Sequence, residues 1–144
     1  MTDSPSYERA SGPLPLAMRL GAALVGLQAL AVLGFALTEL GYGVVEREGL
    51  AIAVALFLGA YGAGLVAGAV LLLRRRSSAR SPLVLAQLLH LGIAWNMRDA
   101  PTTPVAVALA AGSVAALVLL MWPSTTAVLM AAEGGTGEEP DRVA

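Results

Sequence analysis

Four polar side chains that could do chemistry interrupt otherwise apolar stretches of the sequence: Gln28, Tyr61, Gln87 and His90, the only histidine. Gln87 and His90 lie three residues apart, so on a helix they share one face. A histidine can relay protons or bind a ligand, whereas amide and phenol groups donate and accept hydrogen bonds. We expect Gln28, Tyr61 and Gln87 to meet at one depth and hydrogen-bond around His90, with Ser113 in the same layer.

Two interpretations of this polar cluster stay open. In the first, the side chains only join helices, at about 0.6 kcal/mol for each hydrogen bond inside a membrane protein. In the second, they form a ligand-binding site around His90, because ionisable groups inside a membrane are candidate functional sites. The first interpretation is the simpler one.

The composition around these residues indicates a protein whose solvent is lipid. Apolar residues make up 57% of the 144-residue sequence and charged residues 13%, and the mean hydropathy is +0.74. Such values lie outside the range of soluble domains. The net charge of −1, without a basic face interleaved with aromatic residues, argues against nucleic-acid binding.

Apolar segments of the required length predict an all-α fold, a four-helix transmembrane bundle. The predicted spans are residues 16–38, 50–73, 82–97 and 104–122, within a membrane domain of residues 16–130. The first span, about 23 residues long, is enough to cross about 30 Å of hydrocarbon, whereas the third is short. Residues 1–15 and the acidic 133–144 are predicted to be disordered tails. The stretch after Pro123 either continues the last span or lies at the interface.

The first span has a competing interpretation as a cleavable signal peptide. Arg19 would supply its basic start and Ala29, Leu30 and Ala31 its cleavage site. Its apolar core would be far longer than the usual 7–15 residues. A membrane span is therefore preferred.

The arginines indicate how the protein is oriented. The loop between the second and third spans carries Arg74, Arg75, Arg76 and Arg80. Loops rich in arginine stay in the cytoplasm, so both termini should be cytoplasmic in a multi-pass protein of the cell membrane. Trp95 and Trp122 then fall near opposite interfaces, as aromatic belts require. The same arginines are candidates for contact with anionic lipid headgroups.

Small residues recur every four positions in the second span, at Ala60, Gly64 and Gly68. Such a ridge lets helices approach closely in lipid, where packing drives their association. We therefore expect the second span to be the most buried helix. The alternative is that this ridge faces a second copy of the chain or a membrane protein partner.

Several kinds of chemistry are excluded by what the sequence lacks. It has no cysteine, which removes disulfides, thiol catalysis and thiolate metal sites, and one histidine cannot supply a bis-histidine haem. It has no nucleotide-binding or catalytic-triad motif. We expect no cofactor, no metal site and no enzymatic activity.

The second half of the sequence carries Arg80-Ser81-Pro82, then Gln87 within Leu-Ala-Gln-Leu-Leu, and ends its last span with Trp122-Pro123-Ser124. In these features it resembles small uncharacterised four-span integral membrane proteins of actinobacteria, over roughly residues 17–127. The resemblance implies a topology and an origin but no activity.

Two functions are compatible with these features. The first is a non-catalytic accessory or scaffold subunit, or a homo-oligomer. The second is a minimal transporter or channel built on the polar cluster. The chain is similar in size and span number to the small multidrug resistance family, which depends on a glutamate in the middle of its first helix. Here that depth holds Gln28, which argues against proton-coupled export. A water-accessible path to Gln28 and His90 would favour transport, and a dry bundle the accessory role.

A weak internal similarity is also present. Residues 24–36 align with residues 83–95, which places Gln28 over Gln87. Leucine and alanine are so abundant that chance accounts for most of the match. A duplication of two helical hairpins is the alternative explanation.

Overall fold

The computed structural model describes residues 13–99 and 101–134, and within them it leaves undescribed the side chains of residues 42–48, 133 and 134. The described residues contain helices and no strand, so the prediction of an all-α fold is confirmed. The elements in order are α2 (Leu16–Thr38), a π-helical turn η1 (Glu39–Gly43), α3 (Val44–Leu73), a short 3₁₀ helix η2 (Ser77–Ala79), α4 (Arg80–Asn96), α5 (Thr103–Met121) and α6 (Pro123–Gly134).

Three helical stretches among the described residues are long and apolar enough to cross a membrane. They are Leu16–Gly41, Gly49–Leu73 and Thr103–Met121. The helix α4 has 17 residues and is not among them. At 1.5 Å per residue it is about 25 Å long, which makes it the short helix that the sequence also indicated.

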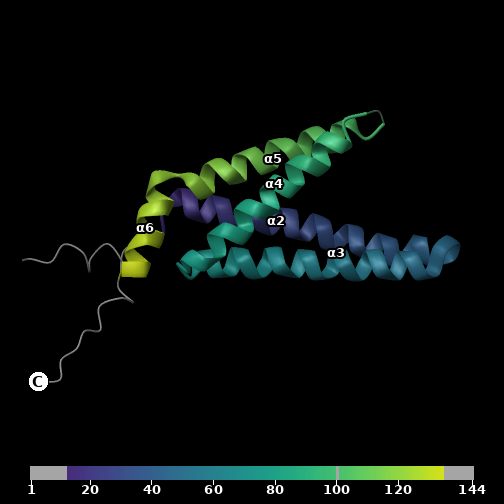
Figure 1. Cartoon of the computed structure of the whole chain (residues 1–144), viewed down its shortest axis with the longest axis horizontal. Coiled ribbons are helices and arrows are strands. Elements are labelled where there is room, and N and C mark those ends of the chain that lie inside the picture. The colour runs from purple at the N-terminus through teal and green to yellow at the C-terminus, as the bar shows by residue number, and fades with distance from the viewer. Residues whose placement is uncertain (1–12, 100, 135–144) are drawn as a thin grey trace, which may run out of the picture.

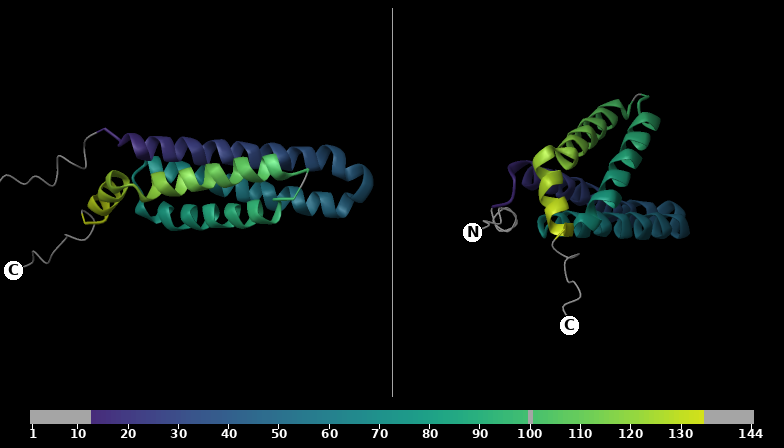
Figure 2. Two further views of the ribbon diagram at one scale, coloured as in Figure 1. Left: turned by 90° about the horizontal axis from the view of Figure 1, so that it is seen from above. Right: turned by 60° about the vertical axis from the view of Figure 1, so that its left-hand side comes forward.

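The four long helices form two antiparallel hairpins, α2 with α3 and α4 with α5 (Figure 1). The hairpins pack so that α2 lies beside α5 and α3 beside α4, whereas no Cα atom of α2 comes within 8 Å of one in α4. The two hairpins meet at the end that carries η2 and diverge toward their other ends, as the right-hand view of Figure 2 shows. The bundle is therefore V-shaped rather than closely packed along its whole length.

Small residues let the helices approach closely at a few points. An ideal Cβ atom on Gly62 of α3 would lie 2.7 Å from Cγ of Leu33 on α2. An ideal Cβ on Gly68 would lie 2.6 Å from Cδ2 of Leu83 on α4, so Leu83 occupies the space above that glycine. Both positions need glycine because the neighbouring leucine fills the place of a side chain.

The expectation that the second span is the most buried helix is wrong. In the most apolar window of α3, 22% of the residues are buried, against 28% for α2. The reason is that part of the small-residue ridge faces outward. Ala60 and Gly64 are exposed, and a Cβ atom on Gly64 would meet nothing within 4 Å. Only Gly68 of that ridge packs under another helix.

The chain bends after α5 at Trp122, whose backbone is extended, and continues as the separate helix α6. α6 packs against α2 and η2 at the closed end of the V (Figure 1). Thr125 is fully buried and its hydroxyl donates to the carbonyl of Leu119 at 3.1 Å, and Leu129 joins the hydrophobic core. α6 ends at Gly134, so it includes the first two residues of the predicted acidic tail. The rest of that tail and residues 1–12 lie outside the described residues.

Candidate functional site

Gln28 of α2 and Gln87 of α4 form a reciprocal amide pair. Nε2 of Gln28 donates to Oε1 of Gln87 at 3.1 Å, and Nε2 of Gln87 donates to Oε1 of Gln28 at 2.8 Å. Gln87 has no exposed surface. Because each amide both donates and accepts, the pair compensates for taking two polar groups away from solvent.

The amide pair bridges two helices whose backbones are not neighbours, so the side chains must reach across the centre of the bundle. Gly112 of α5 makes room for them. An ideal Cβ atom there would lie 3.4 Å from Nε2 of Gln28, and any larger side chain would press on the amide. Nothing in the sequence ties Gly112 to Gln28, so this contact was not predicted.

Tyr61 of α3 meets His90 of α4 beside the amide pair. The Tyr61 hydroxyl lies 3.2 Å from Nε2 of His90 and donates to the carbonyl of Ala86 at 3.5 Å. The two rings meet edge to face, at 5.7 Å between centroids and 88°. The arrangement that uses both protons is a chain in which His90 Nε2–H donates to the tyrosine oxygen and the tyrosine hydroxyl donates to Ala86.

The other ring nitrogen of His90 has no such contact. His90 is 2% exposed, and its Nδ1 has no hydrogen-bond partner among the described residues. In the proton arrangement above, Nδ1 is an acceptor without a donor. Among the described residues it is the one buried side-chain nitrogen or oxygen atom without a hydrogen-bond partner, and such atoms call for an explanation.

The structure thus brings the four predicted residues together, but as two pairs rather than as a ring around His90. Gln28 and Gln87 bond to each other, and only Tyr61 contacts His90. Three residues along a helix rotate a side chain by about 300°, so Gln87 and His90 diverge by about 60°. That difference is enough for Gln87 to reach α2 while His90 reaches α3.

Ser113, the remaining polar residue of this layer, takes no part in the pairs. It is fully buried, but its hydroxyl donates to the carbonyl of Leu109 on its own helix at 2.8 Å. Serine often bonds the preceding turn in this way when no other acceptor is near. The depth of a residue in its span therefore did not decide its partners.

The arginine loop begins with a helix-ending motif that usually carries glycine. The Arg75 N–H bonds to the Leu72 carbonyl at 2.9 Å, and the Arg76 N–H bonds to the Leu71 carbonyl at 3.0 Å. Arg75 adopts a left-handed conformation with φ of 58°. This is the Schellman arrangement, in which glycine is preferred because it lacks a Cβ atom.

The four arginines of this loop do not form one patch. Arg74 and Arg76 are exposed at the end of α3. Arg80 is half-buried at the start of α4, where its Nη2 lies 3.2 Å from the sulfur of Met121 on α5. Arg80 therefore contacts α5, whereas Arg74 and Arg76 stay exposed beyond α3.

No protein-family model, curated protein or solved structure matches this chain. Within residues 13–99 and 101–134, no group of three or more His, Asp or Glu side chains is placed to hold a metal ion. The chemistry available at the centre of the bundle is hydrogen bonding by two amides, a phenol and one imidazole. That set can join helices, and it offers a single unoccupied acceptor at His90 Nδ1.

Proposed function

We propose that the chain is a four-span protein of the cell membrane, with both termini and the arginine loop in the cytoplasm, that acts as a non-catalytic accessory or scaffold subunit or as a homo-oligomer. The observation that carries this proposal is the pairing of the midplane polar side chains with each other. Gln87 and His90 are buried, and the amides of Gln28 and Gln87 are committed to joining two hairpins. Polar side chains that bond to one another in this way suit a packing role better than a permeation path.

The proposal that α4 also crosses the membrane, as the third of four spans, is supported by the residues at its end. Trp95 is 71% exposed one residue before the helix ends, and Trp122 is 50% exposed just after α5. Arg98 lies over the Trp95 ring, 4.3 Å from its centroid. An exposed tryptophan stacked with an arginine is suited to the membrane interface. A length of about 25 Å then requires α4 to stand nearly upright or the bilayer to thin locally.

Cysteine labelling tests this topology cleanly because the sequence has no cysteine. Ser78→Cys lies before α4 and Asp99→Cys after it, and both positions are exposed. With a membrane-impermeant reagent applied to whole cells, we expect Asp99→Cys to react and Ser78→Cys to react only after the cells are broken. If both positions react from the same side, α4 does not cross the membrane. If Ser78→Cys alone reacts from outside, the orientation is wrong.

The accessory role is tested by the mass of the intact complex. The protein is extracted from its native membrane in mild detergent and weighed by native mass spectrometry. We expect a defined assembly, either with a partner protein or of several copies. A bare monomer under conditions that preserve other membrane complexes would contradict the proposal.

A second candidate function, a minimal transporter or channel, is favoured by one observation, the unpartnered Nδ1 of buried His90. A water or substrate that visits this atom would need a polar path to it. The variant His90→Cys tests for that path with a small impermeant thiol reagent applied to whole cells, using Asp99→Cys as the positive control. Protection of His90→Cys supports the accessory role, and labelling favours transport.

A further inference from the structure

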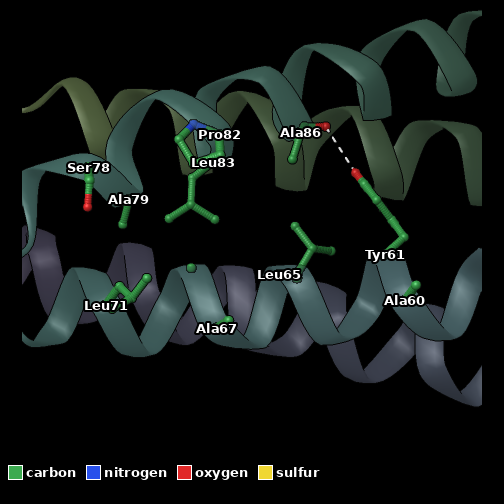
Figure 3. A pocket seen from close by; sticks show the side chains of 12 residues that line it. Ala60, Tyr61, Leu65, Ala67, Leu71, Ser78, Ala79, Pro82, Leu83 and Ala86 are labelled. Atoms are coloured by element: carbon green, nitrogen blue, oxygen red, sulfur yellow. Dashed lines mark hydrogen bonds between the residues drawn. The ribbon is translucent and has the colours of Figure 1, made fainter.

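A groove of about 400 Å³ lies between α3 and α4, and neither glutamine of the amide pair lines it (Figure 3). Its lining is almost entirely apolar and includes Ala60, Gly64, Ala67 and Leu71 from α3, and Ser78 and Leu83 from η2 and α4. Leu83 points from α4 toward α3, and Tyr61 closes one end through its hydrogen bond to the Ala86 carbonyl. The small side chains of α3 are what leave this space open.

The length of the groove matches one leaflet of a bilayer. Eleven residues separate Ala60 from Leu71 along α3, which is about 16 Å at 1.5 Å per residue. Half of a hydrocarbon layer of about 30 Å is about 15 Å. One end of the groove therefore reaches the level of the arginine loop, and the end closed by Tyr61 reaches the middle of the membrane.

Positively charged residues follow the groove at its η2 end, just beyond its lining residues. Arg74 follows Ala67 by seven residues, two helical turns, and so continues the same face of α3. Arg74 and Arg76 are both exposed, and Ser78 lines the groove beside them. An apolar groove one leaflet long, with arginines beyond its headgroup end, complements an anionic lipid, which has an apolar tail and a negatively charged headgroup.

We propose that the groove binds one acyl chain of an anionic phospholipid of the cytoplasmic leaflet, with its phosphate bound by Arg74 and Arg76. This inference rests on the membrane insertion proposed above. A narrow apolar lining suits an acyl chain, and the exposed Arg74 and Arg76 beyond its end favour an anionic lipid over an apolar helix of a partner or of a second copy.

The test counts lipids on the purified protein. The full chain is reconstituted in vesicles of equal parts phosphatidylglycerol and phosphatidylcholine, extracted in mild detergent and weighed by native mass spectrometry. We expect one retained phosphatidylglycerol per protomer and little phosphatidylcholine. The variant Arg74→Gln with Arg76→Gln should weaken retention about 30-fold, because each arginine near an anionic surface contributes to binding. Arg98→Gln, at the other end of α4, is the charge control and should retain the lipid.

A second pair of variants tests the acyl-chain part of the proposal. Gly64→Leu with Ala67→Leu fills the groove from positions that are exposed. Ala63→Leu, whose added bulk matches that of Ala67→Leu alone, is the control on an exposed neighbouring face. We expect only the first to lose phosphatidylglycerol. If that double variant does not fold, Ala67→Leu alone takes its place, with a smaller loss expected.

Three outcomes would overturn the proposal. Equal retention of both lipids would remove the role of the arginines. Unchanged retention of phosphatidylglycerol in the variant Gly64→Leu with Ala67→Leu would show that the groove does not bind the acyl chain. A change of oligomeric mass in that variant, with lipid retention unaltered, would show that a second copy occupies the groove. Loss of lipid from a complex with unchanged subunits separates this inference from the accessory role, which concerns only the protein subunits of the complex.

Discussion

The amide pair offers the sharpest test of how the two hairpins are joined. In Gln28→Leu, the buried Gln87 loses its donor and its acceptor together and keeps no exposed surface to water. A buried polar group left unpaired costs about 1–3 kcal/mol. Gln87→Leu should cost less, because Gln28 is only half-buried and its amide can find another partner. In the double variant, two leucines of similar volume replace the pair, and the cost should be small.

The coupling between the two glutamines follows from their two hydrogen bonds. At about 0.6 kcal/mol for each bond inside a membrane protein, the coupling energy should be about 1.2 kcal/mol. A double-mutant cycle measures it, with the free energy of unfolding taken from reversible titration with sodium dodecyl sulfate in mixed micelles. Gln28→Leu combined with Tyr61→Phe is the control and should be additive, because Tyr61 bonds to other groups. A Gln28–Gln87 coupling energy below about 0.5 kcal/mol would refute the reasoning, because the effects of mutations at independent sites also depart from additivity by up to that amount.

The same titration checks three further expectations. Tyr61→Phe removes the hydroxyl that bonds to both His90 and the Ala86 carbonyl. It should lower the free energy of unfolding by about 1.2 kcal/mol, about 0.6 kcal/mol for each bond, and no change would mean that these contacts contribute nothing. Gly62→Ala should be about 1–2 kcal/mol less stable than Gly64→Ala, because both gain the same helix propensity but only Gly62 lies under a leucine; equal stabilities would contradict the packing described for α2 and α3. Arg75→Gly should raise the free energy of unfolding by about 1 kcal/mol by relieving the left-handed strain, and a loss of stability would show that the side chain contributes more than its backbone costs.

The helices could be read from the sequence because each is set by a local signal. α2 begins and ends at Leu16 and Thr38, the bounds given by apolar length alone, and α3 ends at Leu73, where the arginines start. Pro123 ends the last long helix for the reason that proline always does, the loss of an N–H and a clash with the preceding turn. These are properties of a few neighbouring residues and need no knowledge of the partner helix.

The arrangement of the helices could not be read in the same way. Depth in the membrane follows from position in a span, but the partner of a side chain depends on how each helix is rotated about its axis. A helix that is apolar on all sides gives no sign of that rotation. This is why His90 was expected to have three hydrogen-bond partners and has one, Tyr61. It is also why Ala60 and Gly64 were expected to be buried between helices, whereas they line an open groove. In soluble proteins the polar face would have supplied this information.

The tandem alignment of Gln28 with Gln87 stays a prediction, but the packing of the hairpins gives it a physical meaning. Two similar hairpins related by a two-fold axis along the bundle would place α2 beside α5, α3 beside α4, and α2 diagonally across from α4, which is the order observed. On such an axis a residue faces its own counterpart. A side chain that must bond to its own copy has to donate and accept at once, and an amide does both with matching geometry. A carboxylate at this depth would instead set two like charges against each other, which explains in physical terms why glutamine suits a bundle held together at its centre.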